Sequence, residues 1–191
     1  MSNINEDLDL VRRVLSGDKE SYSALVRKYK EKAYSLAYRL TRNHHDADEL
    51  SQEAFIRAYG SLRDFKGKAS FFTWFYRILV NLCINHINRR PKVVRQPVEE
   101  LNIARSEPDA ISVVANRELR SKIDAAVEKL PSRQKTAFTL RQMEGFSFKE
   151  VCSSMGCSLG AAKASYFQAV QKLRKYLKER GIKEQDIENI D

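Results

Sequence analysis

Helical periodicity is the feature that most limits the folds open to this chain of 191 residues. Apolar side chains recur three and four positions apart through residues 22–40, a spacing that aligns them along one face of an α-helix. They are Tyr22, Leu25, Val26, Tyr29, Ala33, Leu36, Ala37 and Leu40. The same period continues in residues 47–58 and 71–88, and the latter run stops before Pro91. Strand-like alternation between turn signals is absent from the sequence, so we predict an all-α protein.

The second half of the chain carries a helix-turn-helix pattern. Four helices are expected there, over residues 117–130, 132–144, 148–155 and 159–179. Gly156 is placed as a left-handed stop to the third, and Ser158 is placed to cap the fourth. A short helix, a glycine-containing turn and a longer helix are typical of a helix-turn-helix.

Charge divides the chain into blocks. Residues 1–95 carry a net charge of +7 and residues 117–182 a net charge of +8, whereas residues 96–116 and 183–191 carry −3 each. The strip at 96–116 contains two prolines and no long apolar period, so we interpret it as a flexible linker between two small helical domains. The total net charge of +9 favours an anionic partner, most simply nucleic acid.

Several classes of protein are excluded by what the sequence lacks. It contains no apolar run of membrane-spanning length, and residues 1–8 lack a signal-peptide core, so we expect a cytoplasmic protein without membrane insertion. A Ser-His-Asp order and a glycine-rich phosphate loop are also missing, so we expect no enzymatic activity and no cofactor. Cys83, Cys152 and Cys157 form no CxxC pair, and we interpret all three as reduced packing residues.

Residues 46–81 join two different chemistries. The acidic amphipathic segment 46–57 repels nucleic acid and suits a basic protein partner. A basic loop at 63–68 and an aromatic cluster at 71–76 follow, and cations beside aromatic rings suit phosphates and unstacked bases. We therefore expect this half of the chain to contact a protein machine and single-stranded DNA together.

The aromatic cluster is too large to be wholly exposed. On a helix Phe71 shares a face with Phe75, and Phe72 shares a face with Tyr76. We expect Trp74 and one of these pairs to lie in the core, with the remaining rings beside a melted strand.

Histidines and carboxylates crowd together at residues 44–49. Their residue types admit a metal site, but their position at a helix start favours capping by Asp46 and attraction of the carboxylates to the helix dipole. We predict no bound metal.

Two motif blocks in this order resemble the extracytoplasmic-function (ECF) group of bacterial sigma factors. They comprise Gly17–Val26, Asp46–Arg57 and Phe72–Ile78 with Asn81, then Leu130–Arg141 and Glu144–Val151. The resemblance implies that residues 1–95 bind core RNA polymerase and the −10 promoter element. It implies that residues 117–182 bind the polymerase flap and the −35 element. The promoter DNA that the whole chain contacts is then both duplex and melted single strand. It also implies a linker directed toward the RNA exit path and an anti-sigma protein as a partner.

The resemblance assigns roles to individual residues in the first module. Core polymerase contact falls to Asp46, Asp48, Glu49, Leu50, Gln52, Glu53 and Phe55. Contact with −10 DNA falls to Arg63, Phe65, Lys66, Lys68, Ser70, Phe71, Arg77 and Asn81. Within this second set, Asn81 and the loop 61–70 form the pocket for a flipped base. The cations hold phosphates, which affects affinity more than sequence choice.

The final helix departs from the family pattern. Ser165, Gln168 and Val170 occupy positions where the family usually carries arginine, the strongest reader of guanine. The candidate −35 residues are Arg141, Lys163, Ser165, Gln168, Gln171 and Lys172. We expect a weaker or altered −35 contact, with Gln168 and Gln171 suited to adenine. The alternative is that these side chains only solvate the helix.

The leading interpretation is a promoter-specificity subunit of bacterial RNA polymerase. One alternative is a helix-turn-helix regulator that binds duplex DNA without core polymerase. Another is a sigma-like decoy that sequesters an anti-sigma protein and never initiates transcription, and the missing arginines lend weight to it.

Overall fold

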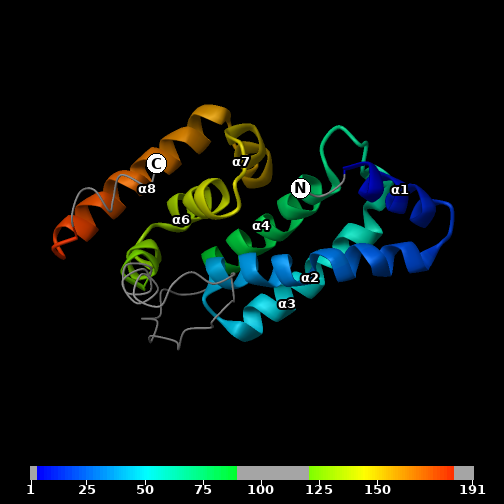
Figure 1. The fold of residues 1–191 in the computed structure, drawn as a ribbon, viewed down its shortest axis with the longest axis horizontal. Helices are drawn as coiled ribbons and strands as arrows, with labels where there is room; N and C mark the ends of the chain where they lie inside the picture. The colour runs from blue at the N-terminus through cyan, green and yellow to red at the C-terminus, as the bar shows by residue number, and fades with distance from the viewer. Residues whose placement is uncertain (1–3, 90–120, 183–191) are drawn as a thin grey trace, which may run out of the picture.

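The computed structural model describes residues 4–89 and 121–182, and every regular element in those ranges is a helix (Figure 1). The first module contains α1 (Ile4–Leu15), α2 (Lys19–Thr41), α3 (His44–Gly60), the 3-10 helix η1 (Leu62–Asp64) and α4 (Phe71–Arg89). The second contains a helix over residues 121–128, then α6 (Ser132–Phe138), the π-helical η2 (Thr139–Met143), α7 (Phe148–Met155) and α8 (Leu159–Lys178). The predicted all-α class is confirmed.

The first module is built on α2, which packs against α1, α3 and α4. Small buried residues, among them Ala33 and Ala37 on α2 and Ala54 on α3, allow the helix backbones to approach closely. Asp18 caps α2 by accepting from the backbone N–H groups of Glu20 and Ser21, at 3.0 and 3.3 Å. The helical period of residues 22–40 therefore becomes one buried stripe against α3 and α4.

The aromatic cluster fills the centre of this module. Phe71, Phe75 and Tyr76 are each 0% exposed and Phe72 is half-buried, so the expectation that one of the two pairs lies in the core is confirmed, and the pair is Phe71 with Phe75. Trp74 is only half-buried, which corrects the expectation that it is a core residue. Its position on α4 turns the indole toward the η1–α4 loop instead of the helix layer.

Local signals specify the helix-turn-helix closely. Ser147 and Glu150 form a reciprocal capping box at the start of α7, and Gly156 ends that helix with a φ of 60°. Ser158 then caps α8 by accepting from the N–H of Ala161 at 3.2 Å. The predicted bounds of α7 and the roles of Gly156 and Ser158 are confirmed.

The helix expected over residues 132–144 is interrupted. Its α-helical part ends at Phe138, and the N–H of Glu144 donates instead to the carbonyl of Thr139 at 3.1 Å, the i→i+5 bond of a π-turn. No glycine or proline precedes Gly145 in this segment, so the sequence held no signal for the change. The linker at 96–116 and the tail at 183–191 lie outside the described residues.

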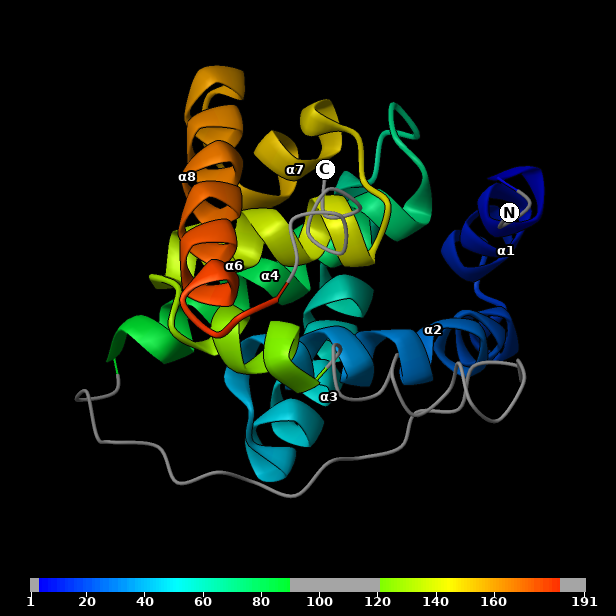
Figure 2. The same ribbon diagram turned by 60° about the vertical axis from the view of Figure 1, so that its left-hand side comes forward.

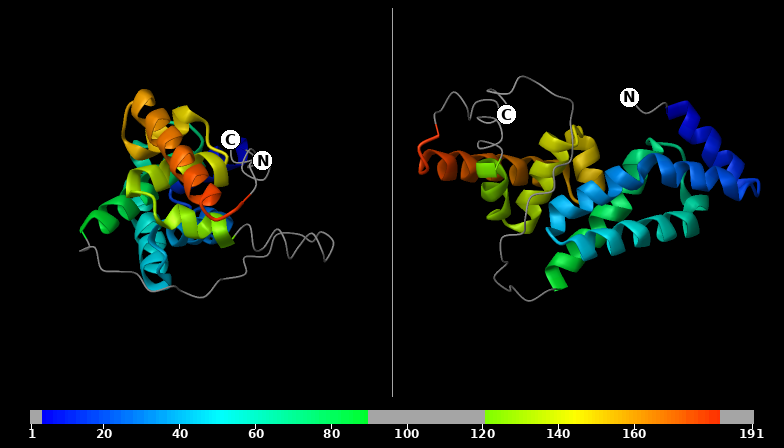
Figure 3. Two further views of the ribbon diagram at one scale, coloured as in Figure 1. Left: turned by 90° about the vertical axis from the view of Figure 1, so that its left-hand side faces the viewer. Right: turned by 60° about the horizontal axis from the view of Figure 1, so that its bottom comes forward.

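The two modules pack directly against each other. Figure 1 shows α4 between the second module and the α2–α3 layer, and α4 contacts both α6 and α7. Turning the molecule shows the same arrangement, with α7 above the start of α4 (Figure 2). Helices α1 and α8 lie at opposite ends of the molecule (Figure 3).

Candidate polymerase and nucleic-acid interfaces

The outer face of α3 carries acidic and amide side chains at helical spacing. Asp48, Glu49 and Gln52 are exposed, and Glu53 is half-buried. Nε2 of Gln52 donates to Oδ2 of Asp48 at 3.0 Å, and Nε of Arg57 donates to Oε1 of Glu53 at 2.7 Å. Exposed pairs of this kind contribute only about 0–1 kcal/mol, so they leave the face available to a partner.

Ile56 gives this face an apolar centre that sequence reasoning missed. Its side chain is 68% exposed, and that of Tyr59, almost one turn further along α3, is 45% exposed. Ile56 follows Asp48 and Gln52 at intervals of four residues, so the three side chains form one row along the helix. That interval was the available signal, since it puts Ile56 on the polar face of an otherwise amphipathic helix.

Three predicted polymerase-binding residues lie inside the first module. Asp46 is 4%, Leu50 7% and Phe55 8% exposed. The ring of Phe55 stacks on Phe75 with centroids 4.5 Å apart. These three side chains therefore lack the exposed surface that the assigned contact requires, and they are corrected to core residues.

Asn43, and not Asp46, caps α3. Its side chain accepts from the backbone N–H of Asp46 at 3.0 Å. The Asp46 carboxylate lies instead 3.2 Å from Nε2 of His86 on α4. His44 is engaged by Tyr34, whose hydroxyl lies 2.6 Å from Nδ1. Within residues 4–89 and 121–182, no group of three His, Cys, Asp or Glu side chains is placed to hold a metal ion.

The loop between η1 and α4 forms a second candidate surface. Arg63, Lys66 and Lys68 are exposed on it. Phe65 is half-buried beside them, with its ring centroid 5.3 Å from that of Trp74. The positive φ of 67° at Gly67 turns the backbone here, a conformation that glycine adopts without strain. Cations and half-covered rings therefore lie together, as the loop sequence predicts.

The start of α4 continues this surface. Trp74, Arg77 and Asn81 follow one another at intervals of three and four residues and so share one face of α4. Arg77 is exposed, whereas Trp74 and Asn81 are half-buried. Trp74 was absent from the predicted −10 set, although its half-buried ring lies beside Phe65 of that set.

Two other members of the predicted −10 set stabilise the fold. Phe71 is 0% exposed, and its ring stacks on Phe75 at 6.0 Å, which corrects its assignment to core. Ser70 lies at the start of α4, where its Oγ accepts from the N–H of Thr73 at 3.1 Å. Ser70 therefore fixes the entry of the chain into α4.

Helix α8 presents most of the predicted −35 residues. Lys163, Gln168, Gln171 and Lys172 are exposed and Ser165 is half-buried. Ala162, Tyr166, Ala169 and Leu173, at helical spacing, are buried and form the inward stripe of α8. Val170 is 3% exposed, so one of the positions where the family carries arginine belongs to the core of this protein.

The exposed face of α8 also holds an aromatic side chain outside the predicted set. Phe167 is 58% exposed and precedes Gln168. Oε1 of Gln168 accepts from Nε2 of Gln134 on α6 at 2.9 Å, which directs the amide toward α6. Gln168 is therefore positioned by a neighbour and is not free to rotate in solvent.

Arg141 has a role within the helix-turn-helix. One of its Nη atoms donates to the carbonyl of Phe146 at 2.9 Å, and its guanidinium lies 5.2 Å from the ring centroid of Phe148. Nζ of Lys163 lies 5.9 Å from the same centroid. Arg141 thus holds the turn before α7, and Lys163 is the more accessible cation of the two.

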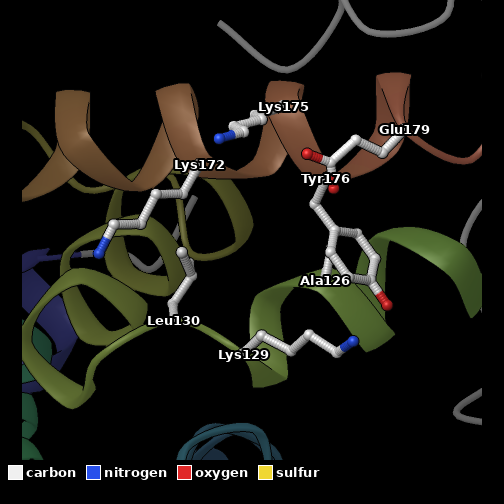
Figure 4. A pocket seen from close by; sticks show the side chains of 7 residues that line it. All are labelled: Ala126, Lys129, Leu130, Lys172, Lys175, Tyr176 and Glu179. Carbon is white, nitrogen blue, oxygen red and sulfur yellow. The ribbon is translucent and has the colours of Figure 1, made fainter.

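A hollow of about 330 Å³ opens between the 121–128 helix and α8 (Figure 4). Ala126 and Leu130 supply apolar surface, and Tyr176 projects from α8 into it. Nζ of Lys129 and the guanidinium carbon of Arg180 lie 4.4 and 3.6 Å from the Tyr176 ring centroid. Three lysines and Tyr176 dominate the lining, and Glu179 is its one carboxylate.

None of the helices in the described portion is long and apolar enough to cross a membrane.

Two known family models match this chain. "Sigma-70 region 2" matches residues 25–92, and "Sigma-70, region 4" matches residues 120–173. The first match covers the α3 face, the basic loop and all of α4, and the second covers the helix-turn-helix. The two helical modules are therefore those of a sigma-70-type transcription factor.

Relatives specify the group. The RNA polymerase sigma-H factor of Pseudomonas aeruginosa is 35% identical over 182 residues, covering 90% of this chain and 94% of that protein. The ECF RNA polymerase sigma-E factor of Escherichia coli is 33% identical over 178 residues, covering 88% and 93%. The chain belongs to the ECF sigma factors, which confirms the resemblance read from the sequence.

Solved structures agree on the fold. CnrH, in a complex with the cytosolic domain of CnrY, superimposes with a TM-score of 0.67 at 21% identity, over 91% of this chain and 98% of that one. The sigma factor RpoE of Bartonella quintana, in a complex with the anti-sigma factor NepR, gives a TM-score of 0.66 at 19% identity, over 83% and 98%.

Proposed function

We propose that this protein directs core RNA polymerase to promoters by binding the polymerase through α3, the −10 element through the loop and α4, and the −35 element through α8. The observation that carries the proposal is the separation of two chemistries on the first module. The exposed row on α3 is acidic with an apolar centre, whereas the η1–α4 loop is basic and aromatic. One surface therefore suits a basic protein and the other suits unstacked DNA.

Core binding is assigned to the exposed row of α3. Asp48, Glu49 and Gln52 supply charge and hydrogen-bond acceptors for a basic partner helix, and Ile56 supplies the buried centre of the contact. Interfaces derive most of their affinity from a few central residues surrounded by a polar rim. We infer that Ile56 is such a centre.

Promoter melting is assigned to the surface around Trp74 and Asn81. An unpaired base that stacks on an aromatic ring gains about 1–3 kcal/mol. The Asn81 amide offers both a donor and an acceptor for the edge of such a base. Capture of the base shifts the population of the promoter toward the open form, in proportion to the difference in affinity for open and closed DNA.

Recognition of the −35 element is assigned to the exposed face of α8. Lys163 and Lys172 supply phosphate contacts, and Gln168 and Gln171 supply amides that can pair with adenine. Without arginine at residues 165 and 168, base readout at guanine is weaker than in the family pattern. RNA synthesis belongs to the polymerase, so we propose no enzymatic activity for this chain.

We also propose an anti-sigma protein as its inhibitory partner. Two structurally similar chains were solved in complexes, one with the anti-sigma factor NepR and one with the cytosolic domain of CnrY. An inhibitor that covers the α3 face would prevent core binding directly.

Transcription by sigma-free core polymerase on fragmented host genomic DNA, with sequencing of RNA 5′ ends, tests the proposal. Discrete start sites with shared upstream elements are expected only when the protein is added. Core binding without new start sites would favour the alternative of a sigma-like decoy, which the scarcity of arginine on α8 supports. Binding to duplex DNA without core binding would favour the helix-turn-helix regulator.

A further inference from the structure

Phe146 of the second module is buried against the first. It lies between η2 and α7 and is 3% exposed. Its ring centroid lies 5.5 Å from that of Phe72 and 5.6 Å from that of Tyr76, both near the start of α4. An aromatic side chain just before the helix-turn-helix is therefore covered by another module of the same chain.

Ion pairs that join the two modules surround the end of α2. Arg39 pairs with Glu144, and Nε of Arg42 donates to Oε1 of Glu128 at 2.6 Å. An Nη atom of Arg42 also lies 3.7 Å from Oδ1 of Asp124. In each pair the cation belongs to the first module and the carboxylate to the second. The contact is thus electrostatically complementary, which favours a specific docking geometry over nonspecific adhesion.

These ion pairs are partly shielded from water, except at Asp124, which is 48% exposed. Exposed fractions are 27% for Arg39, 12% for Glu144, and 26% and 27% for Arg42 and Glu128. Burial alone would lower the pKa of Arg42, but the hydrogen bond and the charge of Glu128, with Asp124, raise it above the usual value for arginine. Arg42 is also the only non-glycine residue with positive φ in the described ranges, at 52°, because it ends α2 as a left-handed C-cap.

Two further hydrogen bonds cross the contact. Nζ of Lys135, which is 4% exposed, donates to the carbonyl of Leu40 at the end of α2 at 3.1 Å. Oγ1 of Thr73, in the first turn of α4, donates to Oε1 of Glu150 at 3.1 Å. Glu150 already closes the capping box of α7, so the same carboxylate ties the helix-turn-helix to α4.

This contact is incompatible with simultaneous promoter binding. Modules of about 60–90 residues have radii of gyration of roughly 10–12 Å, so two in contact have centres about 30 Å apart. The −10 and −35 elements are separated by about 25 base pairs, or roughly 85 Å of DNA at about 3.4 Å per pair. The modules must therefore part before both elements can be bound.

We propose that the free protein inhibits itself through this contact, with Arg39, Arg42 and Phe146 holding the second module over the start of α4. The α3 row stays exposed in the closed form, so closing acts on promoter recognition. Only opened molecules can bind both elements, and the apparent affinity for a two-element promoter falls with the fraction that is open. Higher salt weakens the ion pairs and favours opening. The inhibitory consequence rests on the proposed function, but the closed form can be measured without polymerase.

Small-angle scattering of the full chain tests the closed form. The wild-type protein at 0.1 M salt is expected near a radius of gyration of about 19 Å, the value for two modules of about 11 Å each whose centres lie about 30 Å apart. Arg39→Glu places a carboxylate beside Glu144 and should raise the radius by roughly a third. Combining it with Glu144→Arg should restore compactness. Arg13→Glu makes the same charge change on α1, away from the contact, and should leave the radius unchanged.

Circular dichroism of each variant separates parting of the modules from unfolding, because parting preserves helical content. If Arg39→Glu perturbs folding, Phe146→Ala removes the aromatic contact without a charge change and should expand the chain in the same way. An expanded wild-type chain at 0.1 M salt would overturn the proposal, as would wild-type compactness in both folded variants.

Titration of a two-element promoter with core polymerase preloaded with each variant then tests inhibition. Arg39→Glu should reach half-maximal transcription at about three- to tenfold lower protein concentration than wild type, and Arg13→Glu should match wild type. An unchanged half-maximal concentration for an expanded Arg39→Glu variant would overturn the inhibitory role. Absence of transcription from every variant would instead contradict the proposed function and leave the scattering result intact.

Discussion

The carboxylate of Asp46 lies 3.2 Å from Nε2 of His86, joining the first turn of α3 to the last turns of α4. Asp46 is 4% exposed, whereas Asp48, two residues later, is exposed on the outer face. The acidic run at the start of α3 therefore divides into a residue that holds the module together and residues that face a partner.

Asp46→Asn should separate these roles. The substitution keeps the size of the side chain but removes its charge beside His86, leaving buried polar groups imperfectly paired at a cost of about 1–3 kcal/mol. The melting temperature should fall by roughly 5–10 °C. Thermal denaturation followed by circular dichroism measures the change, with Asp48→Asn as the control. An equal effect of the two substitutions would show that the Asp46–His86 pair does not stabilise the module.

Core affinity should depend on the outer row of α3. Asp48→Lys combined with Glu49→Lys should abolish binding to core polymerase, because it reverses the charge that faces the partner. Ile56→Ala should weaken binding by about 1–2 kcal/mol, or roughly 5- to 30-fold, through loss of buried apolar area. Titration of labelled core polymerase measures both. Glu20→Lys, an exposed reversal on α2, should bind normally, and wild-type affinity of the α3 variants would move the contact elsewhere.

Features encoded within a few residues could be predicted from sequence. The capping box at Ser147, the left-handed Gly156 and the cap at Ser158 are local, so the bounds of α7 followed directly. Whether Asp46, Phe71 and Val170 are buried depended on which helix packs beside each residue. Periodicity shows that a helix has a buried side, but tertiary packing decides where that side begins and ends.

Contacts between the modules had no sequence signal at all. Arg39 and Glu144 are 105 residues apart, and each reads as an ordinary surface charge in its own helix. The net charges of both modules are positive, which predicts repulsion between them. Attraction arises only because the carboxylates of the second module gather at the side that meets α2.

Asn81→Ala should reduce promoter melting and leave core binding intact. Asn81 is half-buried and shares one face of α4 with Trp74 and Arg77, whereas the exposed acidic row belongs to α3. Loss of base hydrogen bonds should lower the fraction of open promoter by about 5- to 30-fold, corresponding to about 1–2 kcal/mol. Permanganate reactivity of unpaired thymines reports opening, and a heteroduplex template that is already melted should rescue the variant. Loss of core binding would contradict the assignment.

The three cysteines should differ in reactivity. Burial raises the pKa of the Cys83 thiol to about 12, whereas Cys152 and Cys157 are half-buried. Alkylation of the native protein at pH 8 should modify two sites quickly and Cys83 only after unfolding, as measured by peptide mass spectrometry. The folded chain binds the Cys83 proton more tightly than the unfolded chain does. The protonated thiol therefore contributes fully to stability below pH 9.0, the ordinary pKa of a thiol, and this contribution declines as the pH rises above that value. Rapid native modification of Cys83 would contradict the buried position.

Gln168→Arg should strengthen binding to the −35 element. Gln168 is exposed on α8 and its amide is directed toward α6 by Gln134. An arginine there can donate two hydrogen bonds to guanine or clamp a phosphate, and a good bidentate pair adds about 1–3 kcal/mol of discrimination. Gln168→Lys carries the same charge without the planar fork, so it separates base reading from phosphate attraction.

Competition between matched and guanine-substituted −35 duplexes, bound by the polymerase holoenzyme, measures that difference. Arginine should raise affinity most for sites that carry guanine, and lysine should raise affinity equally for all sites, with a steeper salt dependence. If both substitutions act equally, residue 168 faces the backbone and the weak readout of this helix originates elsewhere. If neither acts, residue 168 does not face DNA. The half-buried Ser165 then remains the surface position at which a family arginine has been lost, because Val170 is sealed in the core.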